Sequence, residues 1–263
     1  MVRRTVVATC LLILCSSFIL AADKPQTGFL NRTLAMYGTT YKYVVYVPAD
    51  WSPNQKWPVI IFLHGAGERG SDGLKQSEVG LGRAVRLHPE RFPFVIVMPQ
   101  CPEELRWTIA AMQQFALAAL DSEIQEFNGD PTRVYLTGLS MGGFGTWALA
   151  GDNPNKFAAI APVCGGVSVN ERLSRLTGIP VTTDPDVFNK AAQKVRHVPI
   201  WVYHGESDPT VSVSESRNMV KTLQQLGADV SYTEYPGVGH NSWDNAYNEA
   251  DFPQWLLAQQ SKQ

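Results

Sequence analysis

Short apolar runs recur along this chain and alternate with segments of helical character. The runs occupy residues 58–63, 94–98, 133–139, 157–163, 199–203 and 230–235. Continuous runs of this length are typical of strands that are covered on both faces, as in a parallel sheet. The segments between them predict helices over residues 82–87, 108–127, 144–150, 185–194 and 214–226.

This alternation predicts an α/β fold with a mostly parallel central sheet and helices on both of its faces. Two further strands, at 34–37 and 41–47, precede the first buried run, and a terminal helix over 244–260 is interrupted near Pro253. In such sheets the chemistry gathers beyond the carboxyl ends of the strands. Reactive side chains are therefore expected directly after the predicted strands.

Composition is that of one globular domain, which we assign to residues 23–263. The chain has 263 residues, of which 44% are hydrophobic and 17% charged, so it can bury a sizeable core. The formal net charge is −2 and no cluster of Lys and Arg occurs. Binding to nucleic acid therefore has no electrostatic support.

The first 22 residues have the pattern of a secretory signal peptide. Arg3 and Arg4 precede an apolar run over 6–20, and two alanines follow at 21–22. The run is short for a membrane span, which needs about 20 residues. Twin-arginine export and a lipid anchor at Cys15 are weaker matches. We expect cleavage near Ala21 or Ala22, export to the periplasm or medium, and no stable membrane insertion afterwards.

Two cysteines remain after such cleavage, Cys101 and Cys164. In an exported protein they can form a disulfide. They can equally be buried free thiols, which pack as small hydrophobic groups. The sequence leaves both alternatives open.

Residues 133–145 carry the pattern of a nucleophile elbow. An apolar strand leads into Gly138-x-Ser140-x-Gly142, and a helix follows. The serine of such an elbow lies in a strained turn, where crowded backbones require glycine two residues before and after it. A serine hydroxyl is a weak nucleophile that needs a general base, and the base needs an acid to orient it.

The remaining strand ends supply an acid and a base in the order serine, acid, histidine. Asp208 follows the strand at 199–203, and His240 follows the strand at 230–235. This is the chain order of α/β-hydrolases. Glu206 is the rival for the acid, and Asp208 is favoured because it lies beside Pro209 in the turn. His204 shares the loop of the acid, so we expect it to shape that turn.

Two backbone N–H groups are expected to stabilise the developing negative charge. One belongs to Met141, directly after the nucleophile, and the other to Ala66, in the loop after the strand at 58–63. Trp107 and Trp243 follow strand ends at the same edge and are candidates to line a substrate pocket.

No metal or cofactor is predicted. The histidines show no H-E-x-x-H spacing, and no C-x-x-C pair exists. Gly65-x-Gly67 lacks the third glycine of a dinucleotide fingerprint.

Five motifs in order extend this pattern over nearly all of the chain: LHGAGERGSD at 63–72, PQCP at 99–102, GLSMGG at 138–143, HGESD at 204–208 and GHNSW at 239–243. With them the chain resembles the secreted carboxylesterases of the α/β-hydrolase superfamily that are related to polyhydroxybutyrate depolymerases, feruloyl esterases and predicted peptidases. The resemblance implies Ser140, Asp208 and His240 as a triad, with Met141 and Ala66 as oxyanion donors.

The sequence thus predicts a serine carboxylesterase that acts through an acyl-enzyme. The segment 167–197 leaves room for only a small lid, which favours an open cleft and small or medium esters. Two alternatives remain: a serine peptidase on the same fold, and a non-catalytic binding protein that has kept the elbow. The natural ester and the oligomeric state are left open by the sequence.

Overall fold

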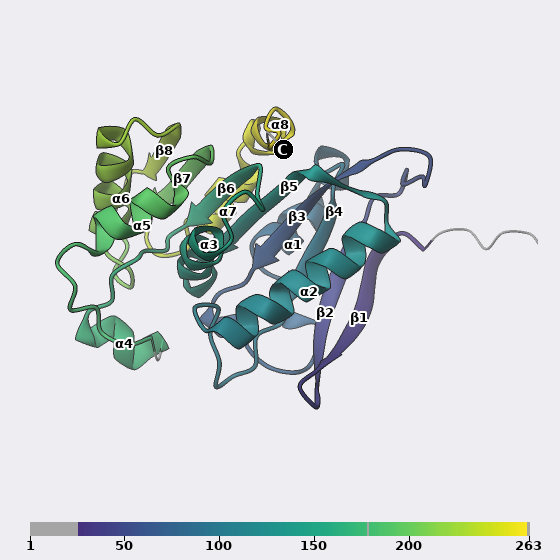
Figure 1. Ribbon diagram of the computed structural model, residues 1–263, viewed down its shortest axis with the longest axis horizontal. Helices are drawn as coiled ribbons and strands as arrows, with labels where there is room; N and C mark the ends of the chain where they lie inside the picture. The colour runs from purple at the N-terminus through teal and green to yellow at the C-terminus, as the bar shows by residue number, and fades with distance from the viewer. Residues whose placement is uncertain (1–25, 178, 262–263) are drawn as a thin grey trace, which may run out of the picture.

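The computed structural model describes residues 26–177 and 179–261. An eight-stranded sheet with the order β1-β2-β4-β3-β5-β6-β7-β8 crosses the molecule (Figure 1). Pairing is antiparallel between β1 and β2 and between β2 and β4, and parallel elsewhere. The strands are β1 (Gly28–Met36), β2 (Thr39–Val47), β3 (Trp57–Leu63), β4 (Val95–Pro99), β5 (Gly129–Leu139), β6 (Ala159–Val163), β7 (Ile200–Gly205) and β8 (Val230–Tyr235).

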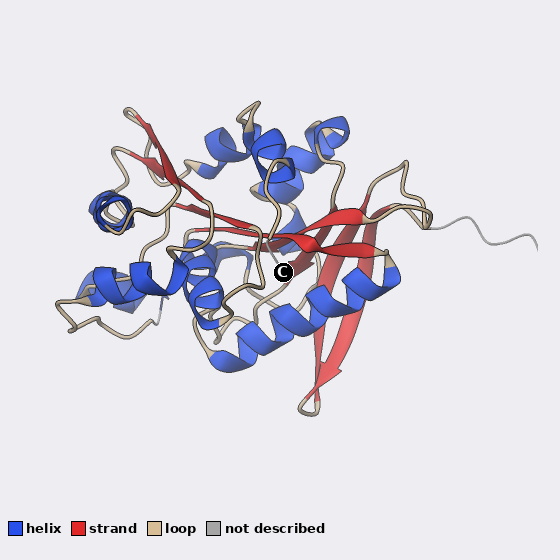
Figure 2. Ribbon diagram, turned by 45° about the horizontal axis from the view of Figure 1, so that its top comes forward, coloured by secondary structure: helices blue, strands red, loops and turns tan. Residues whose placement is uncertain are grey.

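Helices cover both faces of this sheet, as Figure 2 shows in blue against the red strands. The α-helices are α1 (Leu81–Leu87), α2 (Ala110–Glu126), α3 (Met141–Asp152), α4 (Glu171–Thr177), α5 (Val187–Val195), α6 (Ser214–Gln225), α7 (Trp243–Asn248) and α8 (Phe252–Leu257). Three short 3-10 helices are η1 (Ala66–Glu68), η2 (Lys75–Ser77) and η3 (Pro89–Arg91).

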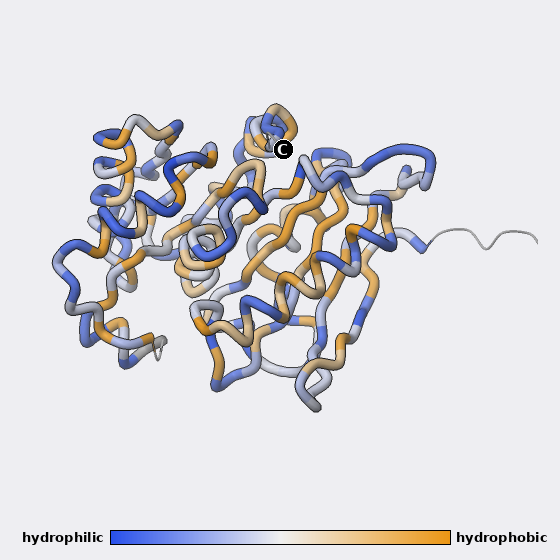
Figure 3. Tube along the Cα trace, in the orientation of Figure 1, coloured by the Kyte–Doolittle hydropathy of each residue, from blue (hydrophilic) through white to orange (hydrophobic). Residues whose placement is uncertain are grey.

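Strand β3 explains why both faces are covered. Its side chains alternate between two apolar clusters: Val59, Ile61 and Leu63 join the cluster formed with α2, α3, α5 and α6. Ile60 and Phe62 join the cluster formed with α1, α7 and α8. Successive side chains of a strand point to opposite faces, so a continuous apolar run fits only a sheet buried on both sides. The hydrophobic colouring of the central strands in Figure 3 follows this core.

The predicted fold is correct, with several differences in where elements begin and end. Strand β1 begins at Gly28 and not at 34, because its polar residues face solvent at the sheet edge while Gly28 pairs with Val47. Helix α4 forms in a stretch predicted to be irregular. The terminal helix breaks over residues 249–251, and Pro253 stands in the first turn of α8, where its missing N–H costs no hydrogen bond.

Both remaining cysteines, Cys101 and Cys164, are buried free thiols, which decides the alternative left open by the sequence. Burial raises the pKa of the Cys101 thiol to about 12, so it stays protonated. The predicted signal segment 1–22 lies outside the described residues. Among those that are described, no helix combines the length and the apolar character needed to cross a membrane.

Candidate active site

The turn between β5 and α3 holds Ser140 in a strained conformation. Its φ of 53° and ψ of −114° lie outside the regions that residues with a side chain favour. Its N–H donates to the carbonyl of Val163 at 2.9 Å, and its carbonyl accepts from Phe144 at 3.1 Å. Strand β6 and helix α3 thus hold the strained residue from both sides. This turn is the elbow predicted from the sequence.

Gly142 is needed because α3 passes directly over the end of β3. A Cβ placed on Gly142 would lie 1.9 Å from the carbonyl oxygen of Leu63, and one on Gly138 would lie 2.5 Å from the carbonyl oxygen of Gly142. Both obstacles are backbone atoms, which cannot move aside as a flexible side chain can. The two glycines therefore set the distance between helix and sheet.

We expect Gly142→Ala to lower the free energy of unfolding by about 3 kcal/mol or more, at the upper end of the cost of overpacking, since the backbone must shift. Urea denaturation measures the loss. Gly67→Ala is the matched control, because nothing lies within 4 Å of its added Cβ. Equal stability of both variants would contradict the proposed close approach.

His240 links the turn to the acid. It lies in the loop after β8, and its Nε2 is 2.9 Å from Ser140 Oγ. Its Nδ1 is 2.6 Å from Oδ2 of Asp208. Half-buried Trp243 packs edge-on against the imidazole, with the ring centroids 5.4 Å apart. Ser140, His240 and Asp208 thus form one continuous hydrogen-bonded chain across three loops of the sheet edge.

The Asp208 carboxylate is fully buried and fully hydrogen-bonded. Its Oδ1 accepts from the N–H groups of Thr210 at 2.8 Å and Val211 at 3.0 Å. Burial alone would raise the pKa of Asp208, but side-chain hydrogen bonds from His204 and His240 outweigh it and hold that pKa well below its usual range. Asp208 is therefore ionised at neutral pH.

Glu206, the rival for the acid, is exposed and turned away from this chain. Its Oε2 accepts from the backbone N–H of Gly237 at 2.9 Å, which ties two loops together. The predicted preference for Asp208 therefore agrees with the contacts.

The two predicted oxyanion donors both begin a helix. Met141 is the first residue of α3, and Ala66 is the first residue of η1. Such N–H groups have no partner within the helix, and in the described part of the chain neither has another partner. The carboxylate of Glu68 accepts from Gly65 N–H at 3.0 Å and fixes the start of η1.

His64 anchors the same loop from below. The N–H of Cys101 donates to Nε2 of His64 at 2.9 Å, so the ring proton is on Nδ1, which donates to the carbonyl of Gly65 at 2.6 Å. Trp107 Nε1 donates to the carbonyl of His64 at 2.9 Å. The prediction for Trp107 is therefore wrong: it is 1% exposed and packs under the loop, where it cannot line an open pocket.

His64 makes stability fall on acidification. Burial lowers its pKa to about 4, while the unfolded chain has the ordinary value of 6.5. The folded state therefore takes up the proton of His64 at a lower pH than the unfolded state does. The contribution of neutral His64 to the free energy of unfolding is complete above pH 6.5 and is lost between pH 6.5 and 4. We expect the loss to be about 3 kcal/mol.

Urea denaturation at pH 7 and pH 4 measures this contribution. In His64→Gln, the difference in unfolding free energy between the two pH values should shrink by about 3 kcal/mol. His88→Gln is the matched control at a half-exposed histidine. An unchanged pH dependence in His64→Gln would contradict the assignment.

A metal ion has one candidate set of ligands in the described part of the chain. Ligand atoms of Cys164, Asp208 and His240 lie within 4.8 Å of one another. Asp208 and His240 already hydrogen-bond each other at 2.6 Å. Two of the three groups are thus already paired with each other, and Cys164 is a buried free thiol.

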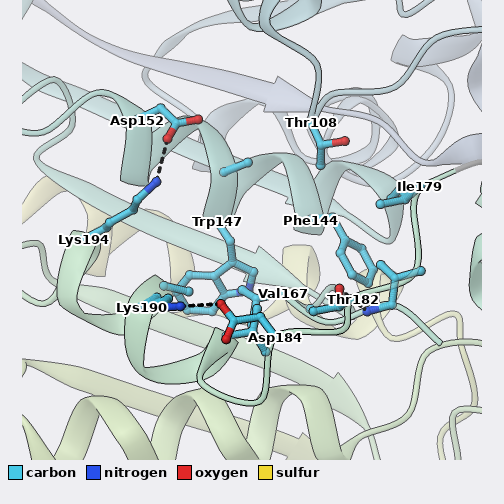
Figure 4. A pocket seen from close by; sticks show the side chains of 15 residues that line it. Thr108, Phe144, Trp147, Asp152, Val167, Ile179, Thr182, Asp184, Lys190 and Lys194 are labelled. Atoms are coloured by element: carbon cyan, nitrogen blue, oxygen red, sulfur yellow. Dashed lines mark hydrogen bonds and ion pairs between the residues drawn. The ribbon is translucent and has the colours of Figure 1, made fainter.

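A cavity of about 290 Å³ lies beside α3 (Figure 4). Phe144 and Trp147 form an aromatic wall, and apolar residues of 167–191 face them. Two ion pairs lie at its rim, Lys190–Asp184 at 2.6 Å and Lys194–Asp152 at 2.9 Å. Phe144 follows Ser140 by one helical turn, and Ser140, Asp208 and His240 are not themselves among the residues that line the cavity.

A polar hollow of about 430 Å³ adjoins the other side of the site at Ala66 and Gly67. Arg69 lines it and donates to the carbonyls of Ala66 at 3.0 Å and Glu103 at 2.7 Å. The hollow thus presents hydrogen-bond donors and acceptors close to Ala66, whose N–H group is the predicted oxyanion donor.

Sequence reasoning missed one contact of the acid. The Nε2 of His204 lies 3.2 Å from Oδ2 of Asp208, the same oxygen that faces His240. In the sequence, the only sign of this contact was the spacing of four residues between the two side chains within HGESD. In a helix this spacing would place them on one face, but in a loop their distance depends on the loop conformation.

A family model described as the prolyl oligopeptidase family matches residues 106–261. The chain belongs to this family. The matched part carries the elbow, the acid and the histidine, whereas Ala66 lies before it. Among solved structures, the crystal structure of a thermostable esterase is 32% identical with a TM-score of 0.72, over 88% of this chain and 63% of that chain.

Two curated relatives are each 29% identical. One is a secreted protein of Arthroderma benhamiae, matched over 75% of this chain and 22% of its own length. The other is the bifunctional acetylxylan esterase/xylanase of Neocallimastix patriciarum, matched over 68% of this chain and 23% of its own length. The chain thus spans about a quarter of either relative.

These similarities confirm the α/β-hydrolase fold and the resemblance to carboxylesterase-type proteins of the serine hydrolase class.

Proposed function

We propose that this member of the prolyl oligopeptidase family cleaves carboxylic esters through an acyl-enzyme on Ser140. The observation that carries the proposal is the chain of hydrogen bonds from Asp208 through His240 to Ser140, at 2.6 and 2.9 Å. These are the distances at which a general base can take a proton from a nucleophile while an acid orients it. The backbone N–H groups of Met141 and Ala66 complete the proposed machinery.

In the first half of the reaction, Ser140 Oγ attacks the ester carbonyl while His240 Nε2 takes its proton. Asp208 keeps the other ring proton on Nδ1 and stabilises the imidazolium that forms. The N–H groups of Met141 and Ala66 stabilise the negative oxygen of the tetrahedral intermediate. The carbon–oxygen bond of the ester then breaks, and the alcohol leaves with the proton from His240.

In the second half, His240 takes a proton from water, which attacks the acyl group on Ser140. Collapse of this intermediate releases the carboxylic acid and returns the proton to Ser140. Every proton donated is recovered, so no cofactor is required by the scheme.

We propose small or medium acyl groups as substrates, bound in the cavity beside α3. Its volume of about 290 Å³ is at the lower end of ligand pockets. The acetylxylan esterase among the relatives supports a short acyl group, and the polar hollow at Ala66 suits a hydroxylated alcohol. A preference for long-chain lipid esters over acetyl and butyryl esters would refute this.

The cavity can be tested by filling it. Ala191 on α5 lines the cavity, and we expect Ala191→Phe to lower kcat/KM for p-nitrophenyl butyrate about tenfold, since a blocked apolar subsite costs roughly 1–3 kcal/mol. Activity on p-nitrophenyl acetate serves as the internal control and should change less than about twofold. Equal losses of kcat/KM on both esters would show that the cavity does not bind the acyl group.

A serine peptidase is the second candidate, because the matching family model is named for an oligopeptidase. Comparing p-nitrophenyl acetate with peptide p-nitroanilides on the purified mature chain separates the two. We expect turnover of the ester and none of the amides above the uncatalysed rate. Amide turnover comparable with that of the ester would favour the peptidase.

We further propose that the chain is exported after cleavage near Ala21 or Ala22, which leaves the domain 23–263. The secreted relative supports this proposal. N-terminal sequencing of the protein recovered from its native compartment tests it, and an intact Met1 there would contradict it.

A further inference from the structure

A second imidazole lies against the proposed acid. His204, at the end of β7, is 0% exposed, and its Nε2 is 3.2 Å from Asp208 Oδ2 and 3.1 Å from the carbonyl oxygen of Val211. His240 approaches the same Oδ2 through Nδ1 at 2.6 Å. With two backbone N–H groups on Oδ1, the carboxylate has four donors. One oxygen is thus shared by two histidines, only one of which reaches Ser140.

The partners of His204 fix its protonation. Both groups near Nε2, a carboxylate and a carbonyl, can only accept, so the proton of the neutral ring is on Nε2. The Nδ1 then accepts from the hydroxyl of Ser216 at 2.7 Å. Ser216 lies in the first turn of α6 and is 2% exposed. Helix α6 therefore holds the ring so that its Nε2–H donates to the carbonyl of Val211 while Nε2 lies 3.2 Å from the Asp208 carboxylate.

We propose that His204 is a positioning residue of the esterase. Its N–H holds the Asp208 carboxylate in one rotamer and takes up part of the charge on Oδ2, so that His240 is oriented without binding its proton too tightly. This inference rests on the proposed function. His204 takes no part in proton transfer in this proposal, because among the described residues its ring nitrogens lie against Ser216, Val211 and Asp208 and not against Ser140.

The other charged groups around this pair are already matched. Glu234 on β8 forms an ion pair with Arg217 of α6, and the carboxylate of Glu215 accepts from the N–H groups of Val167 and Ser168. The thiol of Cys164, at the end of β6, stays protonated because burial raises its pKa. The exposed Glu206 carboxylate accepts from Gly237. Asp208, His204 and His240 are therefore the groups whose charges and hydrogen bonds affect one another at this place.

Replacing His204 by leucine and by glutamine separates positioning from packing. Leucine removes the donor, whereas the Nε2 of glutamine can present an N–H near the position of the histidine Nε2. We expect His204→Leu to lower kcat for p-nitrophenyl acetate by about 10- to 100-fold with KM changed less than about twofold, as for an interaction that acts in the transition state.

The acid limb of the kcat/KM profile gives the decisive readout. Without the second donor, the charge on Oδ2 acts on the imidazole of His240 alone, and a nearby negative charge favours the protonated form of an imidazole. We expect the acid limb of His204→Leu to move up by about 0.5 to 1 pH unit. In His204→Gln the limb should return to its wild-type position and kcat should recover at least about tenfold.

Several outcomes would overturn the inference. One is a folded His204→Leu with wild-type kcat and pH profile, and another is a loss of kcat with an unmoved acid limb and no recovery in His204→Gln. If His204→Leu does not fold, Ser216→Ala takes its place, and we expect it to lower kcat by about 3- to 10-fold with KM unchanged. Wild-type kcat in Ser216→Ala would then overturn the inference.

Controls keep this inference separate from the proposed function. His88→Leu, at a histidine far from the acid in the sequence and half-exposed, should leave kcat and the acid limb unchanged. Ester turnover that disappears in Ser140→Ala but is unaffected in His204→Leu would refute only the role of His204. Absence of turnover that depends on Ser140 in the wild type would refute both.

Discussion

Ser140→Ala is expected to lower kcat for p-nitrophenyl acetate by about 10⁵-fold or more, because it removes the nucleophile of both halves of the reaction. The residual rate should come from the oxyanion donors and substrate binding alone. The substitution removes one oxygen atom at a half-buried position and relieves no backbone strain. The unfolding free energy should therefore stay within about 1 kcal/mol of the wild type.

Ser231→Ala, on the exposed side of edge strand β8, is the matched control and should retain wild-type kcat. Steady-state kinetics at pH 8 with enzyme of known concentration measure both variants. A Ser140→Ala enzyme with more than about a hundredth of wild-type kcat would contradict the nucleophile assignment, since such activity exceeds what binding alone supplies.

Asp208→Asn is expected to lower kcat by about 10⁴-fold while the fold is retained. The amide of asparagine would meet His240 Nδ1 with either its oxygen or its NH₂ group. If the NH₂ faces the ring, it forces the proton onto Nε2, so that the base can no longer accept from Ser140. The N–H groups of Thr210 and Val211 favour this outcome, because they require the single oxygen of residue 208 at the position of Oδ1, which leaves the NH₂ group facing His240.

The matched control is Glu206→Gln, the same change of carboxylate to amide two residues earlier. In the described structure the Glu206 carboxylate accepts from the N–H of Gly237, a contact that glutamine can keep, so kcat should change less than about twofold. Equal losses in the two variants, or a larger loss in Glu206→Gln, would show that the acid has been assigned to the wrong residue.

Much of this fold could be predicted because the hydrophobic pattern of each buried strand agrees with the position of that strand in the sheet. The run at 58–63 is apolar on both faces and forms the central strand β3. Gly138 and Gly142 mark the elbow, because only glycine allows the distances measured there. Histidine and aspartate after successive strands could be paired, since the ends of parallel strands lie at one sheet edge.

The parts that could not be predicted depend on contacts between distant segments. Strand β1 has the polar surface of an edge strand and is defined by its register with β2. Trp107 follows a strand end, as a pocket residue would, yet it packs against His64 from below. The contact of His204 with Asp208 requires the loop conformation, and no local pattern specifies it.

The most direct test of the central claim is to identify the residue that becomes covalently modified. The purified chain is treated with a fluorophosphonate, digested, and the peptides are mapped by mass spectrometry. We expect one adduct, on the peptide that carries Ser140, and much slower labelling in His240→Ala. An adduct on another residue, or no adduct while ester turnover continues, would contradict it.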